Sequence, residues 1–300
     1  MDLYRTLIFV PGIRENMIEK ALAFAADVVM LDLEDSVPPA EKAAARELVR
    51  RSVPRLADAG QTVHVRVNGV SSGLTRDDLA GVMCPELSGV TLAKAESAQD
   101  IRDIDVMLRE QEMAHDTSPG TVVLIPTIES AGGLLRCEEI CGASTRLAGI
   151  TLGADDYTAN LGVQRTREGQ ELTYARQVIA TCAAAADMLA LDTPFDDFRD
   201  EEGLVAETER VKSLGFKGKY LIHPGQIEPV NRIFRPTEEE VAYARRVVEA
   251  FEEARAQGLG AVQLEGRMVD RPVAMRAQRL LATAEAIEAH EGARGQASGR

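Results

Sequence analysis

Short apolar runs alternate with longer stretches of helical spacing along most of the chain. Each run is rich in Val, Ile and Leu, and Ala, Glu and Arg dominate the stretches between them. Continuous apolar strands that alternate with helices are typical of a parallel sheet covered on both faces. The predicted strands are Leu7–Val10, Val28–Leu33, Val63–Val67, Val90–Leu92, Val122–Ile128, Leu147–Leu152, Met188–Leu191 and Tyr220–Ile222, and the predicted helices include Asn16–Ala26, Ala40–Arg51, Gly132–Cys141, Glu171–Ala186 and Glu202–Leu214.

The number of strand–helix units favours a closed barrel over an open sheet. Eight units in series match the α/β fold known as the (β/α)8 or TIM barrel, which commonly occupies about 250 residues as one domain. We therefore expect a catalytic TIM-barrel domain over residues 1–235 of this 300-residue chain.

The pattern changes after residue 235. Thr237 followed by three glutamates is typical of a capped helix start, and Glu265-Gly266 predicts the turn of a short hairpin over Ala261–Val269. We expect residues 236–291 to form a helix–hairpin–helix extension that acts as a lid or as an arm exchanged between subunits. Residues 292–300 are small and polar, and we expect them to lack regular structure.

Composition and charge narrow the class of partner. The formal net charge of −14 argues against nucleic acid or an anionic membrane surface, because both repel an acidic protein. No apolar run approaches the roughly 20 residues of a membrane helix. The four cysteines, Cys84, Cys137, Cys141 and Cys182, show no spacing suited to zinc, and we expect reduced thiols in a cytoplasmic protein.

Polar residues stand where the predicted strands end. Parallel strands of a barrel all end at the same rim, where barrel enzymes place their chemistry, so these side chains are expected to converge on one mouth. Any one of them could instead be a helix cap or a loop residue. The residues concerned are Pro11-Gly12, Glu34-Asp35, Arg66, Asn68, Lys94, Glu129, Asp155-Asp156, Asp192 and His223-Pro224.

Two carboxylate positions suggest a magnesium site. Glu129 ends the fifth predicted strand, and Asp155-Asp156 follows the sixth. Carboxylates on adjacent strands lie close enough to share one cation, and Mg²⁺ prefers one or two carboxylates with water and substrate oxygens completing its shell. The alternative is that Glu129 caps the next helix and that the aspartates begin another.

Arg66 is the unexpected cation. It lies in His64-Val65-Arg66-Val67-Asn68, a strand whose neighbours are apolar, and charged residues are rarely buried without a partner. A guanidinium at the mouth suits a bidentate grip on a carboxylate substrate. An internal salt bridge to Glu34 or Asp35 is the alternative.

Other motifs exclude several chemistries. The chain has no GxGxxG, no P-loop and no GxSxG motif, so neither a dinucleotide fold nor a serine hydrolase is supported. Glycines after the strands, among them Gly12 and Gly153, allow backbone amides to approach a ligand closely.

At this point the sequence resembles the citrate lyase β subunit and its relatives, the citramalyl-CoA and malyl-CoA lyases of the HpcH/HpaI aldolase superfamily. The resemblance covers nearly the whole chain in order. The departures are Ala93, where relatives usually have proline, and His223, where β subunits often have asparagine. The matching stretches are Leu7–Gly12, Leu31–Val37, Val65–Asn68, Ile128–Ser130, Leu152–Tyr157, Gly169–Leu172 with Ala175-Arg176, Gly215–Lys219, His223–Ile227 and Gly266–Asp270.

The resemblance implies a Mg²⁺-dependent lyase that cleaves a 3-hydroxy-carboxyacyl thioester, of the citryl, citramalyl or malyl type, into an acyl thioester and a 2-oxo acid. Glu129 and Asp156 match the metal ligands, since the family's aspartate directly precedes the residue that is Tyr157 here. Arg66 matches the arginine that holds the oxo acid. Asp270 matches a C-terminal acid that reaches a neighbouring subunit's site and moves the proton at the thioester α-carbon, which implies a homo-oligomer, a trimer or hexamer.

Several points stay open on the sequence. The carrier is either CoA or an acyl-carrier protein, and Lys20, with Arg14 and Asn16, either contacts a nucleotide phosphate or is a solvated helix-start charge. The amides of Gly153, Ala154 and Asp155 are expected to contact the substrate, together with Glu129 and Arg66. The alternatives to a thioester lyase are a malyl-CoA-type thioesterase on the same site, an aldolase acting on free acids, and a non-catalytic subunit of a larger complex.

Overall fold

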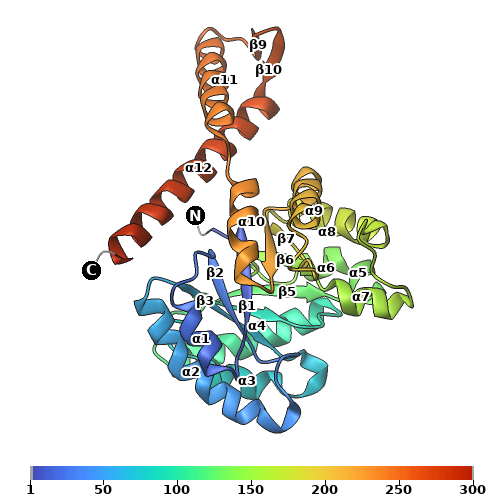
Figure 1. Cartoon of the computed structure of the whole chain (residues 1–300). Helices are drawn as coiled ribbons and strands as arrows, with labels where there is room; N and C mark the ends of the chain where they lie inside the picture. The colour runs from blue at the N-terminus through green and yellow to red at the C-terminus, as the bar shows by residue number, and fades with distance from the viewer. Residues whose placement is uncertain (1–2, 299–300) are drawn as a thin grey trace. The chain divides into compact units, whose positions relative to one another are not determined.

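The computed structural model describes residues 3–298 and divides into two compact units, Tyr4–Asn231 and a second that contains Leu3 and the residues from Arg232 onward. The first unit is a closed barrel of eight parallel strands surrounded by helices (Figure 1). Strand β1 pairs with both β2 and β8, which closes the sheet and confirms the expected TIM barrel. The strands are β1 (Thr6–Pro11), β2 (Val28–Asp32), β3 (Thr62–Val67), β4 (Gly89–Leu92), β5 (Val123–Ile128), β6 (Gly149–Leu152), β7 (Leu189–Asp192) and β8 (Gly218–Leu221).

Helices follow the strands in the expected alternation. The stretch Gly132–Cys141, predicted as one helix, is two short helices that meet at Arg136. The helices up to the end of the barrel are α1 (Glu15–Ala21), α2 (Lys42–Asp58), α3 (Thr75–Val82), α4 (Ala98–Ala114), α5 (Ala131–Leu135), α6 (Cys137–Cys141), α7 (Ala154–Leu161), α8 (Thr173–Ala185), α9 (Glu201–Leu214) and α10 (Ile227–Phe234).

The barrel interior is filled rather than hollow. Every residue of β2 is buried, and one core cluster combines aliphatic side chains with the rings of Tyr4 and Tyr220. Burial on both faces explains why the strands read as unbroken apolar runs. The members of this cluster are Tyr4, Leu7, Val28, Met30, Ile125, Leu191 and Tyr220.

In two places the strand register sets an aspartate opposite a basic residue of the neighbouring strand. Asp32 on β2 lies opposite Arg66 on β3, and Asp192 on β7 lies opposite Lys219 on β8. Adjacent strands are about 4.8 Å apart, so each pair is within reach of a direct ion pair. Each pair is the centre of a cluster of charged side chains, one around Asp32 and Arg66 and one around Asp192 and Lys219.

The second unit is a helix, a hairpin and a long helix. Thr237 and Glu240 form a reciprocal capping box that begins α11 (Glu238–Ala256), as the sequence predicts. The hairpin pairs β9 (Ala261–Leu264) with β10 (Arg267–Asp270), and α12 (Arg271–Ser298) follows it. Its core contains Ala244, Val247, Val269 and Ala277.

Two expectations about this unit need correction. The units separate after Asn231, four residues before the expected boundary at 235. The tail from residue 292 was expected to lack regular structure, yet α12 continues to Ser298, and residues 299–300 lie outside the described part. Ala-rich composition in residues 281–298 favours helix, and this outweighs the small polar residues.

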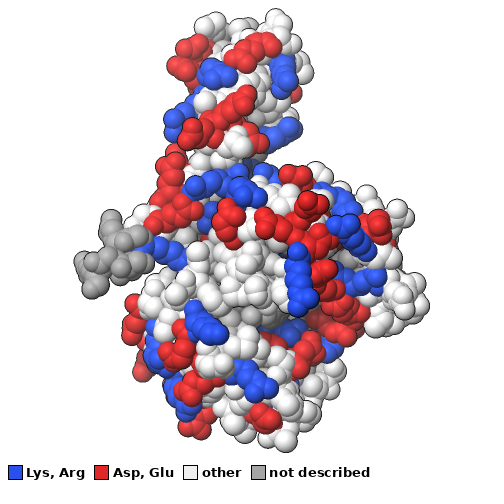
Figure 2. Space-filling view, viewed as in Figure 1, with Lys and Arg blue, Asp and Glu red and all other residues white. Residues whose placement is uncertain are grey.

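Acidic and basic side chains are interspersed on the face shown in Figure 2. Within the described residues, no helix is both long enough and apolar enough to cross a bilayer.

Candidate active site at the barrel mouth

A cavity of about 430 Å³ opens at the carboxyl ends of the barrel strands. Its walls come from β1, β2, β3, β5, β6 and β8 and from the turns that follow them. Arg66, Glu129, Gly153, Ala154, Asp155 and Asp156, six of the residues selected from the sequence, all line it. The mouth is therefore where the predicted residues meet.

Arg66 is held by a bidentate ion pair. Its Nε and Nη2 donate to the two carboxylate oxygens of Asp32 at 2.6 and 2.8 Å, and its guanidinium lies 4.6 Å from the centre of the Phe9 ring. Burial opposes ionisation of Asp32, but the Arg66 hydrogen bonds and charge outweigh it and hold the pKa of Asp32 below its ordinary value. The arginine is thus fixed at the cavity wall in its charged form.

The salt bridge considered for Arg66 also exists. Nη1 lies 3.3 Å from Glu34 Oε2 and donates to Asp35 Oδ2 at 3.2 Å. Asp32, the tightest partner, was not selected from the sequence. The strand register, which no single-sequence pattern reveals, makes it the neighbour of Arg66.

Glu129 is a buried carboxyl beside a second carboxylate. Its residue is 5% exposed, and its Oε2 has no hydrogen-bond partner. Burial first, then the close carboxylate of Asp156 and the negative charge of Glu34, raise the pKa of Glu129 to about 8, against a smaller opposing effect of Arg66. Such a carboxyl is poised to accept a cation.

The alternative role of Glu129 as a helix cap is excluded by its neighbour. Ser130 is the N-cap of α5 and accepts the amide of Gly133 at 2.9 Å. The N-cap of α7 is Gly153, which leaves Asp155 and Asp156 in the first turn of that helix.

Gly153 makes room for Glu129. A Cβ at this position would lie 2.4 Å from Glu129 Cγ and 2.9 Å from its Cδ. Any larger residue would displace the carboxyl, so the Gly-Ala-Asp-Asp turn is shaped around Glu129 as well as around a ligand.

Asp155 and Asp156 have different surroundings. The Asp155 side chain is 72% exposed and pairs with Arg165 at 3.2 Å, and Arg165 also donates to Asp196 at 2.6 Å. Asp156 lies beside Glu129 and 3.8 Å from Lys94 Nζ. The structure therefore brings Asp156, and not Asp155, to the Glu129 carboxyl.

Three polar strand-end residues, Asp192, Asn68 and His223, do not line the cavity at the mouth. Asp192 is fully buried among Arg176, Lys219 and Glu207, and Asn68 is buried against Asp78. His223 caps the short 3₁₀ turn Pro224–Gln226 and stacks on Phe198. Lys94 is at the mouth, and its ion pairs were not predicted.

Two further selected residues, Lys20 and Asp270, are not among the residues that line the cavity. Lys20 is exposed on α1, where Met17 is the residue that lines the cavity, and Arg14 and Asn16 are exposed as well. Asp270 belongs to the second unit, where its Oδ1 accepts the amide of Val273 at 3.2 Å at the start of α12. Its expected role at a neighbouring subunit's site remains a prediction.

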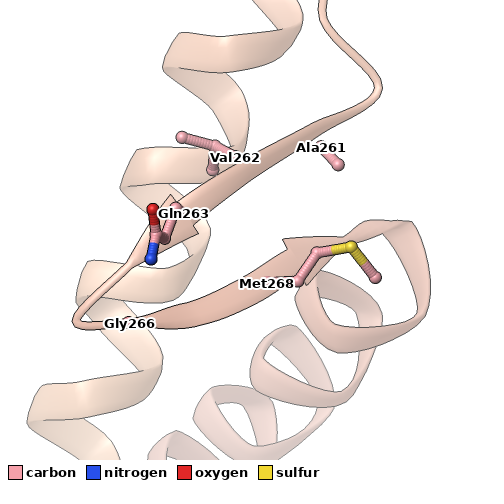
Figure 3. Close-up of a pocket in the computed structure, with 5 residues that line it drawn as sticks. All are labelled: Ala261, Val262, Gln263, Gly266 and Met268. Carbon is pink, nitrogen blue, oxygen red and sulfur yellow. The ribbon is translucent and has the colours of Figure 1, made fainter.

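The second unit carries a shallow pocket of about 370 Å³ on its hairpin (Figure 3). Ala261, Val262, Gln263, Gly266 and Met268 line it, and none of these side chains titrates or carries charge. Acid–base or metal chemistry is therefore assigned to the barrel mouth.

The titratable metal-ligand side chains that line the cavity are carboxylates, with no histidine or cysteine among its lining residues. No group of three or more His, Cys, Asp and Glu side chains within the described residues is arranged to hold a metal. A pair of carboxylates with open positions suits Mg²⁺, which keeps water and substrate oxygens, better than a closed protein cage.

Comparisons with known proteins agree with this arrangement. The family model HpcH/HpaI aldolase/citrate lyase matches residues 5–224. The citrate lyase subunit beta of Leuconostoc mesenteroides subsp. cremoris is 40% identical over 284 residues, 95% of this chain and 94% of that protein. The L-malyl-CoA/beta-methylmalyl-CoA lyase of Cereibacter sphaeroides is 35% identical over 95% of this chain and 96% of its own length.

A solved structure shares the fold and the extension. A Mycobacterium tuberculosis protein, crystallised in complex with magnesium, acetoacetate and coenzyme A, superposes with a TM-score of 0.74 at 33% identity. The match covers 94% of this chain and 98% of that one.

Proposed function

This chain belongs to the HpcH/HpaI aldolase/citrate lyase family, and on that premise we propose that it is a Mg²⁺-dependent carbon–carbon lyase. Its substrate is a 3-hydroxy-carboxyacyl thioester of the citryl, citramalyl or malyl type, and its products are an acyl thioester and a 2-oxo acid. The observation that carries the proposal is the buried Glu129 oxygen without a hydrogen-bond partner, beside Asp156 and in the cavity that Arg66 also lines.

The mouth fits the proposed metal on three counts. Glu129 Oε2 is buried without a partner, Gly153 leaves the space that its carboxyl occupies, and the donors are hard carboxylate oxygens. Glu129 and Asp156 would hold the ion. When bound, Mg²⁺ would supply Lewis acidity toward the hydroxyl and carboxylate oxygens of the substrate.

Other residues of the chain would bind the substrate and transfer the proton. Arg66, held rigid by Asp32, would pair with the carboxylate of the oxo-acid half. The amides of Asp155 and Asp156, in the first turn of α7, would donate to substrate oxygens, as helix N-termini do toward anions, whereas the amide of Ala154 donates to Thr193 Oγ1 at 3.3 Å. Asp270, from a second copy of the chain, would give the proton to the α-carbon of the thioester, or remove it in the reverse direction.

The assembly and location complete the proposal. Supply of Asp270 by a neighbouring subunit requires a homo-oligomer, and we propose a trimer or hexamer. We also propose a cytoplasmic location, with CoA or an acyl-carrier protein as the thioester carrier. Lys20 remains a candidate contact for that carrier.

The test is a mass-spectrometric screen of purified protein with Mg²⁺ against citryl-, citramalyl- and malyl-CoA. We expect one of them to yield a 2-oxo acid and an intact acyl thioester, and Asp156→Ala to lose that turnover by about 10³-fold or more, as loss of a transition-state electrostatic group does. Turnover that survives EDTA would contradict the proposal. Release of free CoA thiol without an oxo acid would favour the thioesterase.

A further inference from the structure

Lys94 places a second cation among the carboxylates of the mouth. Its Nζ forms an ion pair with Glu34 Oε1 and lies 3.9 Å from Asp35 and 3.8 Å from Asp156. Its side chain is 43% exposed, so it lies at the rim of the cavity and not beneath it.

The backbone at Lys94 is strained in a way that aims this side chain. Its φ of 53° is in the left-handed region, which is unfavourable for a residue other than glycine. The amide of Ala93 donates to Val67 O at 3.3 Å, and the amide of Ala95 donates to Thr127 O at 3.0 Å. Both flanking strands therefore impose the conformation, and strain of this kind gathers at functional sites.

The carboxyl groups at the mouth outnumber the cations that face them. Arg66 and Lys94 face the carboxyls of Asp32, Glu34, Asp35, Glu129 and Asp156. Arg66 is fixed on Asp32 by two hydrogen bonds, whereas Lys94 reaches Asp156 only at 3.8 Å, beyond hydrogen-bond distance. Of the two cations, Lys94 is therefore the one that can move away from Asp156.

We propose that Lys94 is a resident counter-cation that competes with the divalent ion for Asp156. In the metal-free protein its ammonium holds Asp156 and Glu34 near Glu129, and on metal binding it withdraws from Asp156 and stays on Glu34. Lys94 therefore lowers the affinity for the metal while keeping the carboxylates in place. The inference rests on the proposed function, because it takes Glu129 and Asp156 as the metal ligands.

The experiment is isothermal titration of the full-length protein with Mg²⁺ alone, and with Mn²⁺ as a second probe. Lys94→Gln removes the charge, and Lys94→Arg keeps it. Lys94→Asn also removes the charge and tolerates the left-handed backbone, so it guards against misfolding. Lys212→Gln, on the exposed face of α9, is the matched control for the loss of one surface charge.

We expect Lys94→Gln and Lys94→Asn to bind both ions on the order of tenfold more tightly, as removal of a unit charge near a divalent ion in a wet site predicts. Lys94→Arg and Lys212→Gln should bind like the wild type. A second readout is thermal: Lys94→Gln should unfold at a lower temperature than the wild type without metal, and the difference should shrink at saturating Mg²⁺. A purely structural role for Lys94 would not produce tighter binding.

The outcomes separate the two claims. If the wild type binds Mg²⁺ and the charge-removing variants bind it equally or more weakly, the competition is wrong and the lyase proposal stands. If the wild type binds neither ion, the proposed metal site fails, and the inference fails with it.

Discussion

Two clusters of charged side chains at strand ends of the same barrel differ in their ratio of cations to carboxyl groups. Each begins with an aspartate and a cation side by side in register, Asp32 with Arg66 at the mouth and Asp192 with Lys219 on the far side. The second cluster is completed by Arg176 and Glu207 and is buried. Its buried part has two cations and two carboxylates, with the half-exposed Arg210 3.7 Å from Glu207 at its edge, whereas the cluster around Arg66 and Lys94 has two cations and five carboxyl groups.

Charge balance explains the different roles. In the buried cluster, Arg176 donates to Asp192 at 2.9 and 3.1 Å, and Lys219 donates to Asp192 at 2.5 Å and Glu207 at 2.7 Å. Burial raises the pKa of both carboxyls, yet the two cations outweigh it and keep both pKa values below the ordinary range. Such a network fastens β7 and β8 to α8 and α9. At the mouth the carboxyl groups outnumber the cations, and Glu129 Oε2, which has no hydrogen-bond partner, is available to a cation.

The largest effect should come from breaking the balanced cluster. Lys219→Met leaves Asp192 and Glu207 buried with one cation between them, and loss of one partner of a buried ion pair costs about 3–5 kcal/mol. Urea unfolding should show this loss of stability. Lys20→Met, at an exposed position on α1, is the control and should stay near the wild type. An equal loss of unfolding free energy in both variants would show that the buried cluster does not contribute specially to stability.

The cluster at the mouth should make the free energy of unfolding depend on pH through Glu129. Glu129 has a folded-state pKa of about 8 and an ordinary value of 4.5, so the folded protein binds the extra proton between these values. Its contribution to stability is full below 4.5 and is lost as the pH rises through about 8. With EDTA, the free energy of unfolding should fall by on the order of 2–4 kcal/mol more in wild type than in Glu129→Gln across this window. Parallel pH profiles for the two proteins would show that Glu129 is not protonated in the fold.

Added Mg²⁺ provides the complementary measurement. A divalent ion binds the ionised carboxylate, so stabilisation by Mg²⁺ should be greater at alkaline pH than near neutrality. The buried cluster, already neutralised internally, should contribute no such dependence.

The shape of the mouth can be tested at Gly153. Gly153→Ala would place a Cβ 2.4 Å from Glu129 Cγ and force the carboxyl to move. We expect Mg²⁺ affinity to fall about 10- to 100-fold, as for other changes next to metal ligands, while the circular-dichroism spectrum stays that of the wild type. Gly142→Ala, with no contact closer than 3.6 Å, is the matched control.

The smallest effect is expected at Asp155. The Asp155 side chain is 72% exposed, so solvent screens its ion pair with the largely buried Arg165, which Asp196 also holds; Asp155→Asn should therefore change stability by less than about 1 kcal/mol. Its Mg²⁺ affinity, measured by titration, should remain near that of the wild type, in contrast to Asp156→Asn. Comparable losses in the two variants would mean that both aspartates serve the metal.

Much of the barrel could be predicted from the chain alone. Unbroken apolar runs arise because both faces of the strands are buried, and their alternation with helices indicated eight strand–helix units. Glu129 and Asp156 could be placed at one rim because parallel strands all end there. The capping box at Thr237 and the hairpin turn at Glu265-Gly266 depend on neighbouring residues only, and both were predicted correctly.

The tertiary structure decided where each strand-end charge points. Asp32 and Asp192 both end apolar strands, and no local pattern separates them, because the period-two alternation disappears when both faces are buried. Asp32 meets Arg66 at the cavity wall, and Asp192 turns to Arg176, which α8 brings from elsewhere in the chain. Local sequence determined the elements and the rim, whereas register and helix packing, which depend on residues distant in sequence, determined which carboxylates stay available for a metal.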